Sequence, residues 1–265
     1  MMMMMKTMRR RKKRMRTNAE LPGRSGRRIP AVPAAALLAL VGFLVLSPLS
    51  RAADEGEAGS ETGTQRAERI IGVIAARYEA ADTYRIEFIQ ESYWALADTL
   101  YASSGTLLLR RPATLAISYD DGSRIVSDGE SLWVYTSQTN QYFATRVRPE
   151  DIMLDPPTLL RGYRIDPDGR FSEPTSCQLS PPGGQSRTVV AISMKPDEGI
   201  SEPAGLDVYI DENERTIVEV LARSLSGDFT RYRISRTVFD VPTESSSFRF
   251  DKPAGARRMG GSGSR

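Results

Sequence analysis

The feature that most constrains the fold is an alternation of apolar and polar residues along the chain. Polar residues stand between Tyr84, Ile86 and Phe88, and the same period of two recurs over 206–210 and 231–235. Successive side chains of a strand point to opposite faces of a sheet. The pattern therefore predicts antiparallel strands with one buried and one exposed face.

Turn-forming residues separate further strand-like segments. Asp-Gly pairs lie at 121–122 and 128–129, and an Asp-Glu-Asn turn lies at 211–213. About ten or eleven short strands at this spacing predict one mainly β domain, built as a large curved sheet or barrel. The other predicted strands cover 100–110, 115–119, 124–127, 132–136, 142–146, 188–194 and 216–222.

One amphipathic helix is predicted before the strands, over 64–81. Thr64 can cap its N-terminus, and apolar residues recur at helical spacing, so one side of the helix covers something apolar. A short helix or loop is expected over 149–160, and exposed loops over 181–185 and 196–203. The apolar residues of the predicted helix are Ile70, Ile71, Val73, Ile74 and Tyr78.

The charge of the chain is divided between two parts. Residues 1–52 carry 12 Lys+Arg and one Glu, a balance of +11, whereas 53–265 carry 24 Lys+Arg and 32 Asp+Glu, a balance of −8. The basic stretch precedes an apolar run of 13 residues at 34–46, followed by small residues at Ser50 and Ala52. This layout predicts a signal peptide that is cleaved after Ala52 and directs export to the periplasm.

Three alternatives bear on this N-terminal region. Translation could begin later, at Met8 or Met15, and the basic block could instead form an arm that binds nucleic acid. Arg27 and Arg28 could belong to a twin-arginine signal, although Ile-Pro-Ala follows them. The apolar run and the cleavage site favour ordinary export.

The exported part is predicted to have a flexible leader at 53–63, one domain at 64–253 and a disordered tail at 254–265. The only cysteine, Cys177, lies far from the cleavage site, so we expect a product without a lipid anchor. The negative balance of this part argues against a nucleic-acid partner.

The composition excludes several kinds of catalytic site. The chain has no His and one Cys, so a Ser-His-Asp triad, a Cys-His dyad and the usual zinc sites cannot form. A hydrolase based on carboxylates stays open, with Asp120, Asp121, Asp128 and Glu130 as candidates. All four lie in or beside turns, where such residues serve the backbone. We therefore predict no catalytic residues, no metal and no cofactor. The apolar inner face of the sheet is instead predicted to enclose an apolar ligand.

Four ordered motifs carry a resemblance to a known family. Residues 105–112 read Gly-Thr-Leu-Leu-Leu-Arg-Arg-Pro, and 125–135 read Ile-Val-Ser-Asp-Gly-Glu-Ser-Leu-Trp-Val-Tyr. The first strand has an aromatic-x-x-x-Phe-x-Gln pattern that ends at Gln90, and Phe248 and Phe250 precede Pro253. Together these motifs resemble the periplasmic outer-membrane lipoprotein carrier family, LolA.

The resemblance implies an incomplete antiparallel barrel whose concave apolar face is covered by the N-terminal helix and a short internal helix. It also implies a monomer that takes acylated lipoproteins from an inner-membrane ABC transporter and delivers them to an outer-membrane receptor. In the family, the arginine before the proline holds the lid helix, which makes Arg111 the latch here. Leu115 and Ile117 stand where members commonly have aromatic residues. The expected cavity wall comprises Tyr84, Ile86, Phe88, Leu115, Ile117, Tyr119 and Trp133.

Two other functions remain open at this stage. A periplasmic sensor of lipoproteins or lipids could use the same fold, although it should carry a second domain for its partner. A secreted hydrolase should lose turnover when Asp120 or Asp128 is replaced by Asn.

Overall fold

The structure is a computed structural model that describes residues 61–147, 156–200 and 202–259. The predicted signal peptide, its cleavage site and the leader up to residue 60 lie outside these residues. So does most of the segment predicted as a short helix or loop at 149–160.

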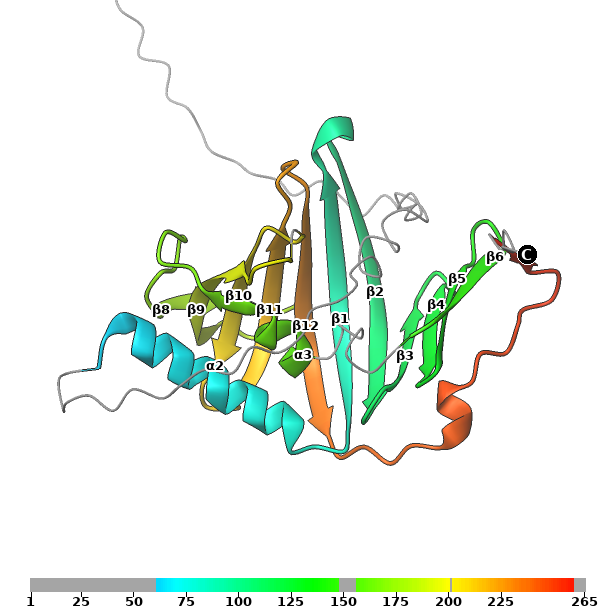
Figure 1. Cartoon of the computed structure of the whole chain (residues 1–265), viewed down its shortest axis with the longest axis horizontal. Coiled ribbons are helices and arrows are strands. Elements are labelled where there is room, and N and C mark those ends of the chain that lie inside the picture. Colours follow the sequence, from blue (N-terminus) through cyan, green and yellow to red (C-terminus); the bar gives the residue numbers. More distant parts are fainter. Residues whose placement is uncertain (1–60, 148–155, 201, 260–265) are drawn as a thin grey trace, which may run out of the picture.

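Thirteen strands of the described residues form one sheet (Figure 1). Their bounds are β1 Thr83–Trp94, β2 Thr99–Arg110, β3 Thr114–Tyr119, β4 Arg124–Asp128, β5 Ser131–Thr136, β6 Gln141–Arg146, β7 Tyr163–Ile165, β8 Thr175–Leu179, β9 Arg187–Pro196, β10 Gly205–Asp211, β11 Thr216–Arg223, β12 Phe229–Phe239 and β13 Arg257–Arg258.

The sheet is open. Its strand order is β13-β6-β5-β4-β3-β2-β1-β12-β11-β10-β9-β7, and β8 pairs with the other part of β9. Every pairing is antiparallel except that of β13 with β6. Among the described strands, β7 and β13 are the two edge strands of this order, and they do not pair with each other. The barrel is therefore incomplete, as predicted. The number of strands exceeds the ten or eleven predicted, because the sequence pattern did not predict β7, β8 and β13.

The predicted turns lie where the strands reverse. Gly122 and Gly129 have φ angles of 87° and 99°, a region that favours glycine because it has no Cβ. Asp121 accepts hydrogen bonds from the backbone N and Oγ of Ser123, at 2.8 and 3.0 Å. These local interactions fix the hairpins β3–β4 and β4–β5.

The long helix α2 spans Gly63–Glu79, so it begins one residue earlier than predicted and ends two residues earlier. Its N-cap is Thr62, and the prediction of Thr64 is wrong. Thr62 Oγ1 accepts from Gln65 N, and the Gln65 side chain accepts from Thr62 N, at 3.2 and 2.8 Å. This reciprocal capping box needs a Gln or Glu three residues after the cap, and Thr62 meets that condition.

Three short helical segments complete the described residues. Helix α3 spans Pro156–Arg161 and overlaps the end of the segment predicted as a short helix or loop, and the 3₁₀ turns η1 and η3 span Ala95–Ala97 and Ser245–Phe248. No helix in the described part of the chain combines the length and apolar character needed to cross a membrane.

The C-terminal segment runs along the outside of the sheet and ends beside β6 (Figure 1). Phe248 is buried, and Arg257 N and Met259 N donate to the carbonyls of Asn140 and Tyr142 at 3.1 and 2.7 Å. The prediction of a disordered tail from residue 254 is therefore wrong for 254–259. Pairing through the backbone does not require an apolar pattern, and the sequence has none there.

Candidate functional site

One face of the sheet carries the main apolar core, and α2 lies against it (Figure 1). We call it the helix-covered face. Ile70, Ile74 and Tyr78 are buried in this core because their spacing places them on one side of the helix. Ile71 is half-buried at its margin, whereas Val73 lies on the exposed side of α2.

The structure brings together six of the seven residues predicted to form the cavity wall. Tyr84, Ile86 and Phe88 lie on β1, and the residues of β3 join them through β2, where Leu107 pairs with both Ile86 and Ile117. The rings of Phe88 and Tyr119 meet edge to face at 5.8 Å. Five of them belong to the apolar cluster that α2 contacts, and the partly buried Tyr119 packs against it: Tyr84, Ile86, Phe88, Leu115 and Ile117 are the five.

Trp133 lies on the opposite face. Its neighbours in β5, Leu132 and Val134, point into the helix-covered core, so strand alternation turns Trp133 outward. There its ring stacks on Phe250 at 5.9 Å with an angle of 10° between the planes. The structure therefore does not place Trp133 with the other predicted wall residues. The motif around Trp133 carries no information about which face meets the helix.

The other half of the helix-covered face was not named in the predicted site. It is formed by β9, β10 and β11, whose inward side chains are fully or almost fully buried. The period of two over 206–210 could have identified this half of the face. The predicted wall residues came from the family motifs, however, and these motifs fall in the β1–β5 half. The residues concerned are Ile192, Met194, Leu206, Val208, Ile210 and Ile217.

The side chain of Arg111 holds the C-terminal end of α2. Its Nε donates to the carbonyl of Ala81 at 3.2 Å, and one terminal nitrogen donates to the carbonyl of Tyr78 at 3.1 Å. Its backbone N also donates to Asp82 O at 3.0 Å. Carbonyls at the end of a helix lack partners within it, and a guanidinium can satisfy several at once. Arg111 thus ties the end of α2 to the end of β2.

Tyr78 makes a second attachment at the same end of α2. Its hydroxyl accepts a hydrogen bond from Ile217 N at 3.3 Å, and its ring meets those of Tyr84 and Phe239 at 5.4 and 5.1 Å. Burial raises the pKa of Tyr78, so the hydroxyl stays neutral. The sequence marked Tyr78 as an apolar residue of the helix but gave no sign of this polar contact.

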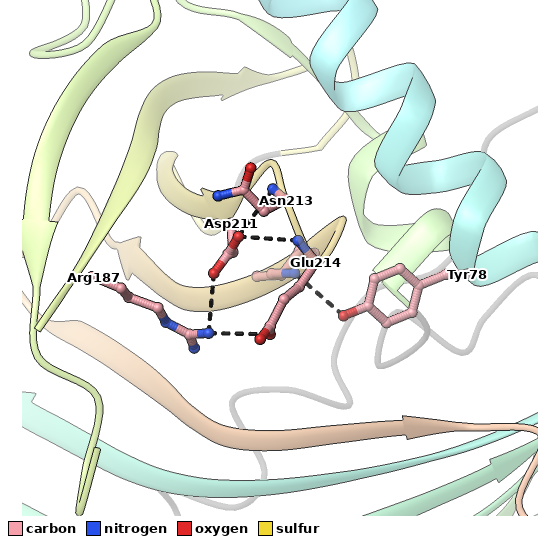
Figure 2. Close-up of polar contacts among 6 residues, drawn as sticks. Tyr78, Arg187, Asp211, Asn213 and Glu214 are labelled. Carbon is pink, nitrogen blue, oxygen red and sulfur yellow. Dashed lines mark hydrogen bonds and ion pairs between the residues drawn. The ribbon is translucent and has the colours of Figure 1, made fainter. Parts of the chain in front are cut away.

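The strand connection that receives Tyr78 is itself held by hydrogen bonds (Figure 2). Asp211 Oδ1 accepts from Asn213 N and Glu214 N at 3.0 and 3.1 Å. Arg187 joins Asp211 and Glu214 at 3.1 and 3.2 Å. These bonds fix the turn just before the start of β11, where Ile217 meets Tyr78 of α2.

A small polar cluster interrupts the helix-covered face farther along β1. Tyr119 Oη donates to Gln90 Oε1, and Gln90 Nε2 donates to Ser92 Oγ, both at 3.1 Å. Gln90 and Ser92 are buried. Burial, and then the charge of Asp121, raises the pKa of Tyr119, so its hydroxyl remains a donor. The apolar face thus has one end that can form hydrogen bonds.

Three of the carboxylates considered for a hydrolase accept structural hydrogen bonds: Asp121 and Asp128 within their own turns, and Asp120 from β2. Asp128 Oδ1 accepts from Glu130 N and Ser131 N at 3.0 and 2.8 Å, and Asp120 accepts from Ser104 Oγ. Within 61–147, 156–200 and 202–259, no three Cys, Asp or Glu side chains gather as metal ligands. Burial raises the pKa of Cys177, which disfavours its nucleophilic thiolate.

A depression of about 350 Å³ lies on the face opposite α2. Arg85, Glu87 and Ser118 contribute to its lining, and Ser247 of η3 borders it. Leu108 and Ala116 also line it, so its walls are mixed, whereas side chains of α2 and the strands form one buried apolar cluster on the helix-covered face.

Comparison with known proteins decides the family. The family model described as "Outer membrane lipoprotein carrier protein LolA" matches residues 79–251. The chain belongs to the LolA family. The match begins at the last residue of α2 and includes Arg111 and both halves of the apolar face.

This LolA-family chain is 25% identical to the outer-membrane lipoprotein carrier protein of Alkalilimnicola ehrlichii over 69% of its own length and 80% of the relative. An uncharacterized conserved protein from Thermus thermophilus is similar over 74% of this chain and 99% of its own, with 12% identity and a TM-score of 0.45. LprF from Mycobacterium bovis is similar over 75% and 100%, with 10% identity and a TM-score of 0.42.

Proposed function

We propose that this LolA-family protein is a periplasmic carrier of lipoproteins. It binds the acyl chains of lipoproteins released by an inner-membrane ABC transporter and delivers them to an outer-membrane receptor. It acts as a monomer and without a cofactor. The observation that carries this proposal is an extended apolar face closed by one helix, whose end is held by Arg111.

The energies of lid and cargo are of comparable size. Lifting α2 exposes Ile70, Ile74 and Tyr78, each worth roughly 1.5–3 kcal/mol of burial. An acyl chain gains about 0.8 kcal/mol for each buried CH₂. About ten methylenes therefore offset the lost helix contacts, so cargo can displace the lid and the lid can in turn help to expel cargo.

The hydrogen bonds of the Arg111 side chain stabilise only the closed form of the protein, because their acceptors are carbonyls at and just beyond the end of α2. Loss of the guanidinium should favour the open, cargo-bound form. We expect Arg111→Leu to load acylated lipoprotein but to transfer it to acceptor membranes at least tenfold more slowly, since 1.4 kcal/mol corresponds to a factor of ten.

The test begins with protein purified from the periplasm without detergent, and intact-mass spectrometry identifies any acylated partner. Transfer of a labelled lipoprotein is then compared for wild type, Arg111→Leu and Arg110→Leu. Arg110 is the matched control, because its guanidinium lies over the Phe248 ring, 4.7 Å from the centroid. Normal transfer by Arg111→Leu would refute the latch, and consistent absence of acylated partners from the wild type would refute the carrier.

A further inference from the structure

Most of the large exposed apolar side chains gather at one end of the molecule. In the described residues there are four: Val73 is 43% exposed, Leu96 102%, Leu100 54% and Leu225 83%. The three leucines lie at the tips of the β1–β2 and β11–β12 hairpins. Single exposed apolar residues are ordinary, but a group of them marks an interaction surface.

The two tips form one surface, which we call the leucine tip and define by Leu96, Leu100 and Leu225. Ala95 N donates to Asp228 Oδ1 at 2.7 Å, and the Tyr93 and Phe229 rings stack at 5.2 Å. Figure 1 shows the β1–β2 hairpin rising above the rest of the sheet, with the β11–β12 turn beside it. The three leucines therefore lie at the same end of the molecule.

The backbone of the leucine tip is hydrogen-bonded within the protein. Asp98 N donates to Ala95 O at 3.3 Å, and Gly227 N donates to Ser224 O at 3.2 Å. Leu225 N donates to Glu202 Oε1, also at 3.3 Å. A segment that enters lipid must satisfy its own backbone groups, because lipid offers no partners. The apolar side chains of the leucine tip stand on turns in which several backbone N–H groups are already hydrogen-bonded within the protein.

Aromatic side chains lie directly behind the leucines. The Trp94 and Tyr101 rings meet at 5.7 Å, and both pack against the core of the helix-covered face. Trp and Tyr are enriched where proteins meet the boundary between lipid and water. The aromatic pair thus lies between the leucine tip and the apolar face, and the buried polar side chains of Gln90 and Ser92 follow it along β1.

Charge distinguishes the kind of lipid surface. The carboxylates of Asp98, Asp228 and Glu202 lie among the tip residues, and the nearby Arg223 is already paired with Asp207 at 2.9 Å. Attraction to anionic lipids requires basic side chains. Binding by this surface must instead come from burial of apolar side chains.

We propose that the leucine tip inserts reversibly into the boundary between headgroups and acyl chains of a phospholipid bilayer. The proposal rests on the carrier function and deepens it: the tip touches the membrane at the end of the apolar face that α2 does not clamp. An acyl chain that leaves the bilayer there passes along Trp94 and Tyr101 into the face instead of through water.

The test titrates the exported protein with phosphatidylcholine vesicles and follows flotation and Trp fluorescence in a Trp133→Phe background. We expect wild type to float with the vesicles and Trp94 emission to shift to shorter wavelength. The variant Leu96→Ser/Leu100→Ser/Leu225→Ser should bind on the order of 100-fold more weakly. Val73→Ser, which removes the remaining exposed apolar side chain of the four, should bind as the wild type does.

Three outcomes would overturn the membrane proposal: no binding of wild type to the vesicles, equal binding of wild type and the triple variant, or binding that requires anionic lipid and disappears with salt. If the triple variant lost lipoprotein transfer while wild type ignored vesicles, the tip would be a protein-docking surface instead. Uptake of a diacylated lipopeptide in solution separates the proposals, because the triple variant should retain it even where membrane contact fails.

Discussion

The two ends of the helix-covered face are built in opposite ways. At the clamped end, Arg111 and Tyr78 join α2 to β2 and β11, and aromatic rings fill the space between them. At the hairpin end, buried polar groups around Gln90 give way to exposed leucines. The two ends therefore have different roles. The clamped end keeps α2 attached to the sheet, while the hairpin end is free to meet an apolar partner.

The largest expected effect is at the clamped end. Tyr78→Ala removes a fully buried ring and the acceptor for Ile217 N, so we expect a loss of about 3–5 kcal/mol in the free energy of unfolding. At the hairpin end, Leu96→Ala should change it by less than about 0.5 kcal/mol. Urea unfolding followed by circular dichroism measures both. Similar losses in the two variants would contradict the division between the ends.

A smaller effect is expected from the polar cluster between the two ends. Gln90→Leu leaves the buried Tyr119 hydroxyl without its acceptor, which should cost about 1–3 kcal/mol of unfolding free energy. The double variant Gln90→Leu/Tyr119→Phe removes both partners and should recover much of this loss. A double-mutant cycle from urea unfolding gives the coupling. Additive losses would show that the hydrogen bond contributes nothing.

The smallest effect concerns the outward face of the sheet at β11. Glu219 is buried on the outward side of β11, with Arg231 Nε at 3.4 Å and with Arg233 and Glu91 also nearby. Burial raises its pKa more than the arginines lower it. The folded state therefore binds the proton more tightly than the unfolded state, and ionisation destabilises the fold as pH rises from the ordinary carboxyl range through the raised pKa.

Glu219→Gln should accordingly unfold at a slightly higher temperature than wild type at neutral pH. The advantage should shrink as the pH falls below the ordinary Glu pKa, where the wild-type side chain is also protonated. Thermal melts at several pH values measure this difference. Exposed Glu212, replaced by Gln, serves as the control and should show little change. A Glu219→Gln variant that is less stable at neutral pH would mean that the arginine contacts outweigh burial.

Much of the fold was predictable because local rules determine it. The period of two identifies strands such as β1 and β10, and Asp-Gly turns identify the reversals around Gly122 and Gly129. By contrast, β7 has three residues and β13 has two. Segments this short cannot display a period, and their pairing depends on backbone groups that every residue carries.

The site was predictable only in part. The alternation of side chains along a strand assigns a residue to one face of the sheet, but it does not say what covers that face. Arg111 and Tyr84 followed from motifs, and the structure places both beside the end of α2. Trp133 lies on the other face, against Phe250, a residue 117 positions away in the sequence (250 − 133). The contact between Tyr78 and Ile217 is similarly distant, and no local pattern reports it.

The position of β13 has a consequence for association between copies of the chain. An open barrel has two borders whose free N–H and C=O groups could pair with strands of another molecule and begin fibrils. At one border β13 occupies part of β6, and at the other β7 is short while β8 occupies much of the remaining edge of β9. The C-terminal strand thus helps a sheet with an extended apolar face to avoid self-assembly.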